Sequence, residues 1–206
     1  KVSKSDHYKS LDANQVLLSI TQNPIIWYQV PFVYLKRGND SIRSLVGVDK
    51  KSKYASFANF FDTQGNYKLA PYLEAAYKSA TPNQFEKDFI QTDRKVNLLF
   101  SALEGKVLRI FPVPNDENNL WVSPAEVNEI SFEGVDSLYV NNVLPLYLTS
   151  LRQGQATQDY TQADQLLESL KGYQKKYGVE VMPIEDQIKA ELYYNKYDIF
   201  IIYLFS

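Results

Sequence analysis

Few residues in this chain have the types and spacings that catalysis requires. His7 is the single histidine and cysteine is absent, which excludes a thiol nucleophile, a disulfide framework, a Cys/His zinc site and haem held by two histidines of this chain. A Ser-His-Asp triad would have to use His7. That residue lies in a polar N-terminal tail, where we expect mobility and an ordinary surface histidine. The sequence also lacks a glycine-rich phosphate-binding motif.

The carboxylates give no stronger indication of an active site. Asp116–Glu117 and Glu185–Asp186 are adjacent pairs, whereas a glycosidase needs two carboxylates that face each other across the substrate. The NDENN loop (115–119) offers oxygen ligands for Ca²⁺ but lacks the spacing and the glycine of an EF-hand. Asn and Asp side chains in such a loop bind the neighbouring backbone. We therefore predict no catalytic residue, no metal site and no cofactor in this chain.

Aromatic side chains beside hydrogen-bonding amides form the best candidate contact surface. Phe111 and Trp121 flank the NDENN loop, and a tyrosine-rich helix face lies near the C-terminus. Such groups suit contact with a peptide or another ligand, and they serve equally well to pack a hinge between lobes. The predicted partner-contact residues are Phe111, Asp116, Asn118, Trp121, Tyr194 and Asn195.

Helices supply most of the framework that positions these residues. Asp12 predicts the N-cap of a helix within 11–22. Thr81 and Gln84 have the spacing of a capping box for a second helix, which Gly105 ends. The apolar stripe of this second helix follows the helical period and comprises Phe85, Phe89, Val96, Leu99, Phe100 and Leu103.

A Pro- and Asn-rich connection over 112–125 divides the chain into two mostly helical lobes. We predict an N-terminal lobe over 1–111 and a C-terminal lobe over 126–206, which contains a helix from about Tyr160 to Tyr177 that Gly178 ends. The apolar stripe of this helix comprises Ala163, Leu166, Leu167, Leu170, Tyr173 and Tyr177. The predicted fold is mainly α, with helical hairpins in two packed lobes and one or two short extended segments.

The last helix loses its polar face toward its end. Ile188, Leu192, Ile199 and Ile202 form a stripe, and from Tyr197 onward the sequence is apolar nearly all round. That run is shorter than the roughly 20 apolar residues that cross a bilayer. It is interpreted either as a buried C-terminal helix or as the first turns of a transmembrane helix. We favour the transmembrane interpretation, because the first residue is not methionine and a processed or excised chain is therefore expected.

The charge balance argues against a nucleic-acid partner. The chain has 22 Lys and Arg residues against 24 Asp and Glu, a formal charge of −2. Binding to nucleic acid needs a basic face that displaces counterions from phosphates. We therefore expect no nucleic-acid binding.

Four segments occur together in an order typical of one family: LDANQVLLSITQNPIIWYQVPFVYLKRGND, SKYASFANFFDTQGNYKL, GKVLRIFPVPNDENNLWVSP and IKAELYYNKYDIF. They resemble the extracytoplasmic region of the long, fused system II cytochrome c biogenesis proteins, the Ccs-type haem-attachment machinery. The resemblance covers nearly the whole chain. Its most distinctive parts are the FPVPNDENN-W and E-YYNK-IF segments, neither of which is a catalytic motif.

The resemblance implies a multi-span membrane synthetase that exports haem and attaches it to reduced CxxCH cysteines of apocytochrome c. This chain would be its non-catalytic domain on the periplasmic side of the bacterial inner membrane, where it would either dock apocytochrome or scaffold the adjacent membrane modules. The implied partners are apocytochrome c and the adjacent membrane modules of the parent. Haem is expected in the parent rather than in this chain, because His7 matches none of the family's histidine motifs and Trp27 and Trp121 form no tryptophan-rich segment.

A second class of function stays open from the residues alone. A secreted or lipid-anchored helical protein that binds carbohydrate or peptide would use tyrosine and tryptophan rings as stacking platforms. That alternative requires an accessible aromatic cleft. A structure that buries Tyr193, Tyr194 and Trp121 together would count against it.

Overall fold

The computed structural model describes residues 2–5 and 7–197, with only the backbone described for Glu185 and residues 195–197. This part of the chain holds eight α-helices, two 3-10 helices and three antiparallel two-stranded ladders. The prediction of a mainly α fold with short extended segments is therefore confirmed. The α-helices are α1 (Ala13–Gln22), α2 (Pro24–Trp27), α3 (Asp40–Val46), α4 (Ala70–Lys78), α5 (Gln84–Leu103), α6 (Gly134–Thr157), α7 (Thr161–Gly178) and α8 (Glu185–Tyr197).

The strands are very short, two residues each, and the connection between β3 and β4 contains α3. Each ladder joins two consecutive strands, β1 with β2, β3 with β4 and β5 with β6. The remaining elements are β1 (His7–Tyr8), β2 (Leu11–Asp12), β3 (Val33–Tyr34), β4 (Tyr54–Ala55), β5 (Phe111–Pro112), β6 (Trp121–Val122), η1 (Phe57–Phe60) and η2 (Val127–Glu129).

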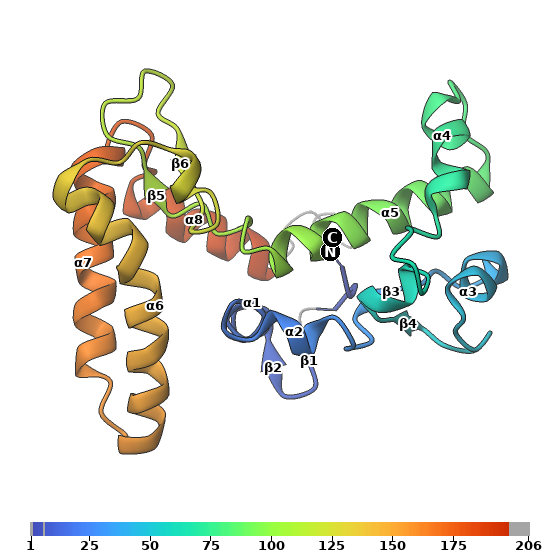
Figure 1. Cartoon of the computed structure of the whole chain (residues 1–206), viewed down its shortest axis with the longest axis horizontal. Coiled ribbons are helices and arrows are strands. Elements are labelled where there is room, and N and C mark those ends of the chain that lie inside the picture. The colour runs from blue at the N-terminus through green and yellow to red at the C-terminus, as the bar shows by residue number, and fades with distance from the viewer. Residues whose placement is uncertain (1, 6, 198–206) are drawn as a thin grey trace, which may run out of the picture. The chain divides into compact units, whose positions relative to one another are not determined.

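The chain divides into two compact units. Unit 1 comprises residues 1–109 and 123–129, and unit 2 comprises residues 110–122 and 130–206. Figure 1 shows the helices of unit 1 in blue to green and those of unit 2 in yellow to red. The β5–β6 hairpin therefore belongs to unit 2, whereas the residues that follow it return to unit 1.

Unit 1 is built on an apolar core around α5. Phe89, Val96 and Leu99 of α5 are buried against Trp27 and Phe60, among other side chains of one continuous cluster. The start of the chain joins this unit as the β1–β2 hairpin, in which His7 pairs with Asp12. The segment around His7 is therefore a paired strand and not an unpaired tail, and His7 is exposed, as expected of a surface histidine.

Two helix starts show how capping chemistry selects a boundary. Asp12 caps α1 as predicted, with its carboxylate accepting from the Gln15 backbone N–H at 2.8 Å. The predicted cap of the long helix at Thr81 is wrong, since Asn83 caps α5 in a reciprocal box with Glu86. Both pairs have the required spacing, but the charged Glu86 is also stabilised by the positive end of the helix dipole.

The apolar stripe of α5 is only partly buried. Phe85 and Phe100 each remain 42% exposed, although both were expected in the core. Phe85 lies in the first turn, where it packs on Phe89 with ring centroids 4.5 Å apart. Phe100 lies at the edge of the stripe and forms part of an open hollow that is described below.

Unit 2 is an α6–α7 hairpin that carries the β5–β6 hairpin (Figure 1). The turn after α6 is tight, because Gln158 adopts a left-handed conformation with φ of 61° and Tyr160 lies directly over Gly154. Helix α7 spans Thr161–Gly178, close to the predicted limits. Ala163 and Tyr173 of its predicted stripe are buried, whereas the other members are only partly covered or exposed.

Helix α8 lies where the last helix was expected, but its first apolar positions are exposed: Ile188 by 39% and Leu192 by 64%. The continuation of that stripe at Ile199 and Ile202 lies outside the described residues, as does the apolar run from which a transmembrane start was inferred. Within the described ranges, no helix combines the length and the apolar character needed to span a membrane.

Candidate binding site

The residues predicted to contact a partner lie mostly on one hairpin of unit 2. In its ladder Phe111 pairs with Val122 and Pro112 with Trp121, and the Val113 N–H donates to the Leu120 carbonyl at 2.8 Å. The NDENN segment forms the tip of this hairpin. The structure thus brings Phe111, Asp116, Asn118 and Trp121 into one local element.

The tip of the hairpin is organised by its own side chains. The Asp116 carboxylate accepts the backbone N–H groups of Asn118 and Leu120, both at 3.0 Å. Asn115 and Asn119 adopt left-handed backbone conformations, with φ of 57° and 52°. Asn tolerates this region better than most residues because its side chain satisfies local backbone groups. Asp116 therefore holds the turn, while Asn118 is exposed beside it.

The aromatic residues of the hairpin pack it onto α7. Phe111 is fully buried, with its ring 6.3 Å from that of Tyr173 in an edge-on arrangement. Trp121 is half-buried, and its indole lies so close to the backbone of Gly178 that a Cβ there would collide with it. The Gln174 side-chain amide also donates to the Ile110 carbonyl at 2.9 Å. Phe111 and Trp121 thus anchor the hairpin within unit 2.

The two remaining predicted residues belong to α8. Tyr194 is 42% exposed and its neighbour Tyr193 is 61% exposed. The structure therefore does not bury Tyr193, Tyr194 and Trp121 together, which would have counted against a carbohydrate- or peptide-binding protein. Asn195 lies in α8, but its side chain is outside the described part of the structure. The contact roles of these residues stay a prediction.

An aromatic hollow in unit 1 is a stronger candidate for binding. Its volume is about 610 Å³ and five of its nine lining residues are Tyr or Phe. The Phe57 ring stacks with that of Phe100 at 5.8 Å between centroids and lies 4.9 Å from that of Phe61. The lining residues of this aromatic hollow are Tyr28, Phe57, Ala58, Phe61, Asp62, Tyr67, Val96, Asn97 and Phe100.

Local hydrogen bonds fix the walls of the aromatic hollow. Ser56 and Asn59 form a reciprocal capping box around η1, which holds Phe57 in place. The Tyr67 hydroxyl donates to the Asp93 carboxylate at 3.0 Å. Burial, followed by the charge of Asp93 and this hydrogen bond, raises the pKa of Tyr67, so Tyr67 stays a neutral donor at physiological pH. These contacts thus hold Phe57 and Tyr67 in place within the wall.

The polar groups of the aromatic hollow are few. The Asp62 carboxylate accepts from the backbone and side-chain N–H groups of Asn66, and these hydrogen bonds lower its pKa. Asn97 contributes an exposed amide from α5. Ligand sites commonly combine a mostly apolar wall of 300–1,000 Å³ with a few such polar groups. The arrangement suits an apolar or aromatic side chain, or a small ring compound.

Sequence reasoning missed this hollow for a specific reason. The segment SKYASFANFFDTQGNYKL attracts attention by its aromatic content, but its rings meet Tyr28 and Phe100 only in the folded unit. The one available signal was Phe100 itself, which sits at the edge of the α5 stripe. Neither observation predicts a cavity without the tertiary contact.

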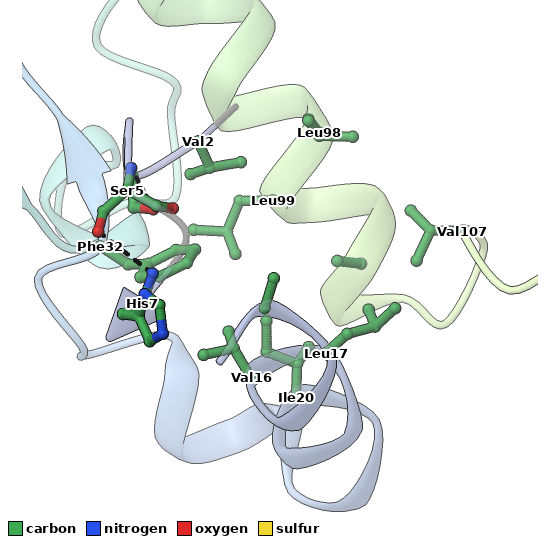
Figure 2. A pocket seen from close by; sticks show the side chains of 13 residues that line it. Val2, Ser5, His7, Val16, Leu17, Ile20, Phe32, Leu98, Leu99 and Val107 are labelled. Atoms are coloured by element: carbon green, nitrogen blue, oxygen red, sulfur yellow. Dashed lines mark hydrogen bonds between the residues drawn. The ribbon is translucent and has the colours of Figure 1, made fainter. Parts of the chain in front are cut away.

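A second hollow of about 300 Å³ has mainly aliphatic walls. Figure 2 shows His7 and Ser5 at one side of it, with Val16 and Ile20 of α1 facing Leu99 of α5. Haem is the cofactor that the resemblance implies for the parent, and its two carboxylates need cationic or other strong donors. The described lining contains no Lys or Arg. The residues of this hollow therefore do not fit haem, even though the single histidine lies beside it.

The described residues also lack a metal-binding cluster: within residues 2–5 and 7–197, no three His, Asp or Glu side chains come together in a way that could hold a metal ion. Of the two carboxylates in the loop that was considered for Ca²⁺, that of Asp116 is engaged with the hairpin backbone.

Comparison with known proteins gives one informative relationship. No protein-family model matches the chain. Over 203 residues it is 29% identical to Protein NrfI of Wolinella succinogenes, in an alignment that covers 97% of this chain and 22% of that relative. The similarity extends along nearly the whole chain. The chain thus corresponds to about a fifth of the relative's length.

Proposed function

We propose that this chain is the extracytoplasmic domain of a membrane protein that exports haem and attaches it to apocytochrome c. In that role it lies on the periplasmic side of the bacterial inner membrane and docks the unfolded apocytochrome, without chemistry of its own. The observation that carries this proposal is the similarity to NrfI along nearly the whole chain, together with the four segments typical of the system II proteins.

The aromatic hollow supports docking over a purely structural role. An unfolded polypeptide exposes apolar and aromatic side chains, which a preformed aromatic-lined cavity can bind at low entropic cost. Such a contact is weak and adaptable, because an unfolded partner loses conformational entropy when it becomes ordered. These properties suit a domain that must hold an apocytochrome and release it after haem attachment.

Calorimetric titration of unfolded, reduced apocytochrome c into the 206-residue chain tests the proposal. We expect weak, saturable binding, and no stoichiometric low-spin haem spectrum when the chain is purified with excess haem. An absence of binding would contradict docking and leave only a scaffold for the adjacent membrane modules. A stoichiometric haem spectrum would overturn the assignment of haem to the parent alone.

The same aromatic hollow and the exposed Tyr193 and Tyr194 also favour a second candidate function, that of a carbohydrate- or peptide-binding protein. Rings of this kind also stack on the apolar faces of sugars. A glycan array on the isolated chain separates the two, because the docking proposal predicts binding to the unfolded apocytochrome and no glycan.

A further inference from the structure

Positive charge in unit 1 is concentrated in one short stretch of sequence. Residues 36–53 contain six Lys and Arg against two Asp, a net charge of +4 in a chain whose total is −2. The stretch folds as the loop before α3, α3 itself and the loop that leads into β4. Charge segregated to this degree needs an explanation beyond solubility.

Most of these cations line one open hollow of about 290 Å³. Arg37, Lys50, Lys51 and Lys53 are exposed, and none of the four has an ion-pair partner among the residues that the structure describes. Asp40 is the one carboxylate in the lining. The lining residues of this basic hollow are Arg37, Gly38, Asp40, Arg43, Lys50, Lys51 and Lys53.

Arg43 forms the buried part of the basic hollow. It is only 3% exposed, and its guanidinium donates to four backbone carbonyls at distances between 2.9 and 3.1 Å. Since all four acceptors are neutral, the hydrogen bonds are satisfied while the positive charge is not cancelled by a carboxylate. The accepting carbonyls belong to Leu35, Lys36, Asn39 and Ser52.

The same contacts hold the two cation-bearing loops together, because three of the carbonyls lie before α3 and the fourth lies in the loop before β4. In that second loop, the Ser52 N–H donates to the Asp49 carbonyl at 2.9 Å and closes a turn with Lys50 and Lys51 at its centre. The Asp49 carboxylate accepts the Lys51 backbone N–H at 2.7 Å, so it is engaged with the turn itself. The cations are therefore presented by a fixed framework.

We propose that the basic hollow binds phosphate groups, supplied either by a free phosphate compound or by the headgroup of an anionic phospholipid. A single carboxylate is satisfied by one arginine, whereas a phosphate offers several oxygens and up to two negative charges to several donors. The four exposed cations that have no ion-pair partner can donate to these oxygens, and the uncancelled charge of Arg43 also attracts the phosphate. Asp40 is the one carboxylate in the lining and repels the phosphate with a single negative charge. The inference goes beyond docking of apocytochrome and does not depend on it.

Two binding measurements on the 206-residue chain test the site and separate the sources. Inorganic pyrophosphate is titrated by calorimetry at low ionic strength, and the chain is co-sedimented with phosphatidylcholine vesicles that contain about 30% phosphatidylglycerol or none. We expect binding in at least one measurement. Pyrophosphate binding supports a free phosphate compound, whereas retention on the anionic vesicles alone supports a lipid headgroup. Failure in both would overturn the proposal.

A matched pair of variants ties the binding to this hollow. Lys50→Gln, Lys51→Gln and Lys53→Gln combined should weaken binding at least tenfold, and Arg37→Gln on the opposite loop about threefold. The control combines Lys87→Gln, Lys175→Gln and Lys189→Gln, which are exposed positions elsewhere in the chain, and removes the same charge. It should stay within twofold of the wild type. Equal losses in the two triple variants would contradict a defined site and indicate only a general effect of net charge.

Discussion

The indole of Trp121 lies directly on the backbone of Gly178, the last residue of α7. A Cβ built on Gly178 would collide with Cζ2 of the indole and would lie only 3.1 Å from Cε2 and Cη2. This contact joins the β5–β6 hairpin to the helix, since Trp121 is the β6 residue that pairs with Pro112. Gly178 is thus required by close approach and not by an unusual backbone conformation.

Gly178→Ala should therefore destabilise the chain by about 1–3 kcal/mol, because the added methyl group forces Trp121 off α7. Gly172→Ala is the matched control on the same helix, where a Cβ meets no atom within 4 Å. Alanine has the higher helix propensity, so this control should gain roughly 0.5–1 kcal/mol. Urea unfolding of both variants measures the difference, and equal effects would contradict the close contact.

Arg43→Met should cost about 3 kcal/mol of unfolding free energy, because four buried or partly buried backbone carbonyls lose their donor. The neighbouring Arg37→Met removes an exposed cation from the same region and should stay within about 0.5 kcal/mol of the wild type. Thermal unfolding and urea titration compare the two. A mild effect of Arg43→Met would show that the loops are held by other contacts.

Tyr67→Phe should reduce the sensitivity of unit 1 to alkaline pH. The folded chain raises the pKa of Tyr67 above its ordinary value of 10, chiefly by burial and then by the charge of Asp93. The unfolded chain then loses this proton first, so the contribution of Tyr67 is complete below about pH 10 and declines at higher pH. Urea unfolding between pH 8 and pH 11 should show a shallower decline for Tyr67→Phe. An unchanged slope would argue that Tyr67 ionises in the folded chain.

Local chemistry made several elements predictable from the sequence. Asp12 identifies the start of α1 because its carboxylate caps the helix without help from distant residues. The limits of α5 and α7 follow from apolar periodicity and from Gly105 and Gly178. The cap of α5 was misplaced by two residues because Thr81 and Asn83 both satisfy the capping spacing, and only the folded chain shows which pair forms.

Features that depend on tertiary contact were not predictable. The two-residue strands are too short to show an alternating pattern. Phe111 and Trp121 were identified by type, but the sequence left open whether they pack or bind, and the structure packs both against α7. The aromatic hollow joins residues as distant as Tyr28 and Phe100, a proximity that no local spacing encodes.

A pair of matched phenylalanines on α5 tests whether the aromatic hollow docks unfolded apocytochrome. Phe100 and Phe85 are equally exposed, at 42%, but only Phe100 lines the hollow. Calorimetric titration with reduced apocytochrome should show affinity at least tenfold weaker for Phe100→Ala, about 1.4 kcal/mol, and within twofold of the wild type for Phe85→Ala. Equal affinities for the two variants would contradict docking at the aromatic hollow.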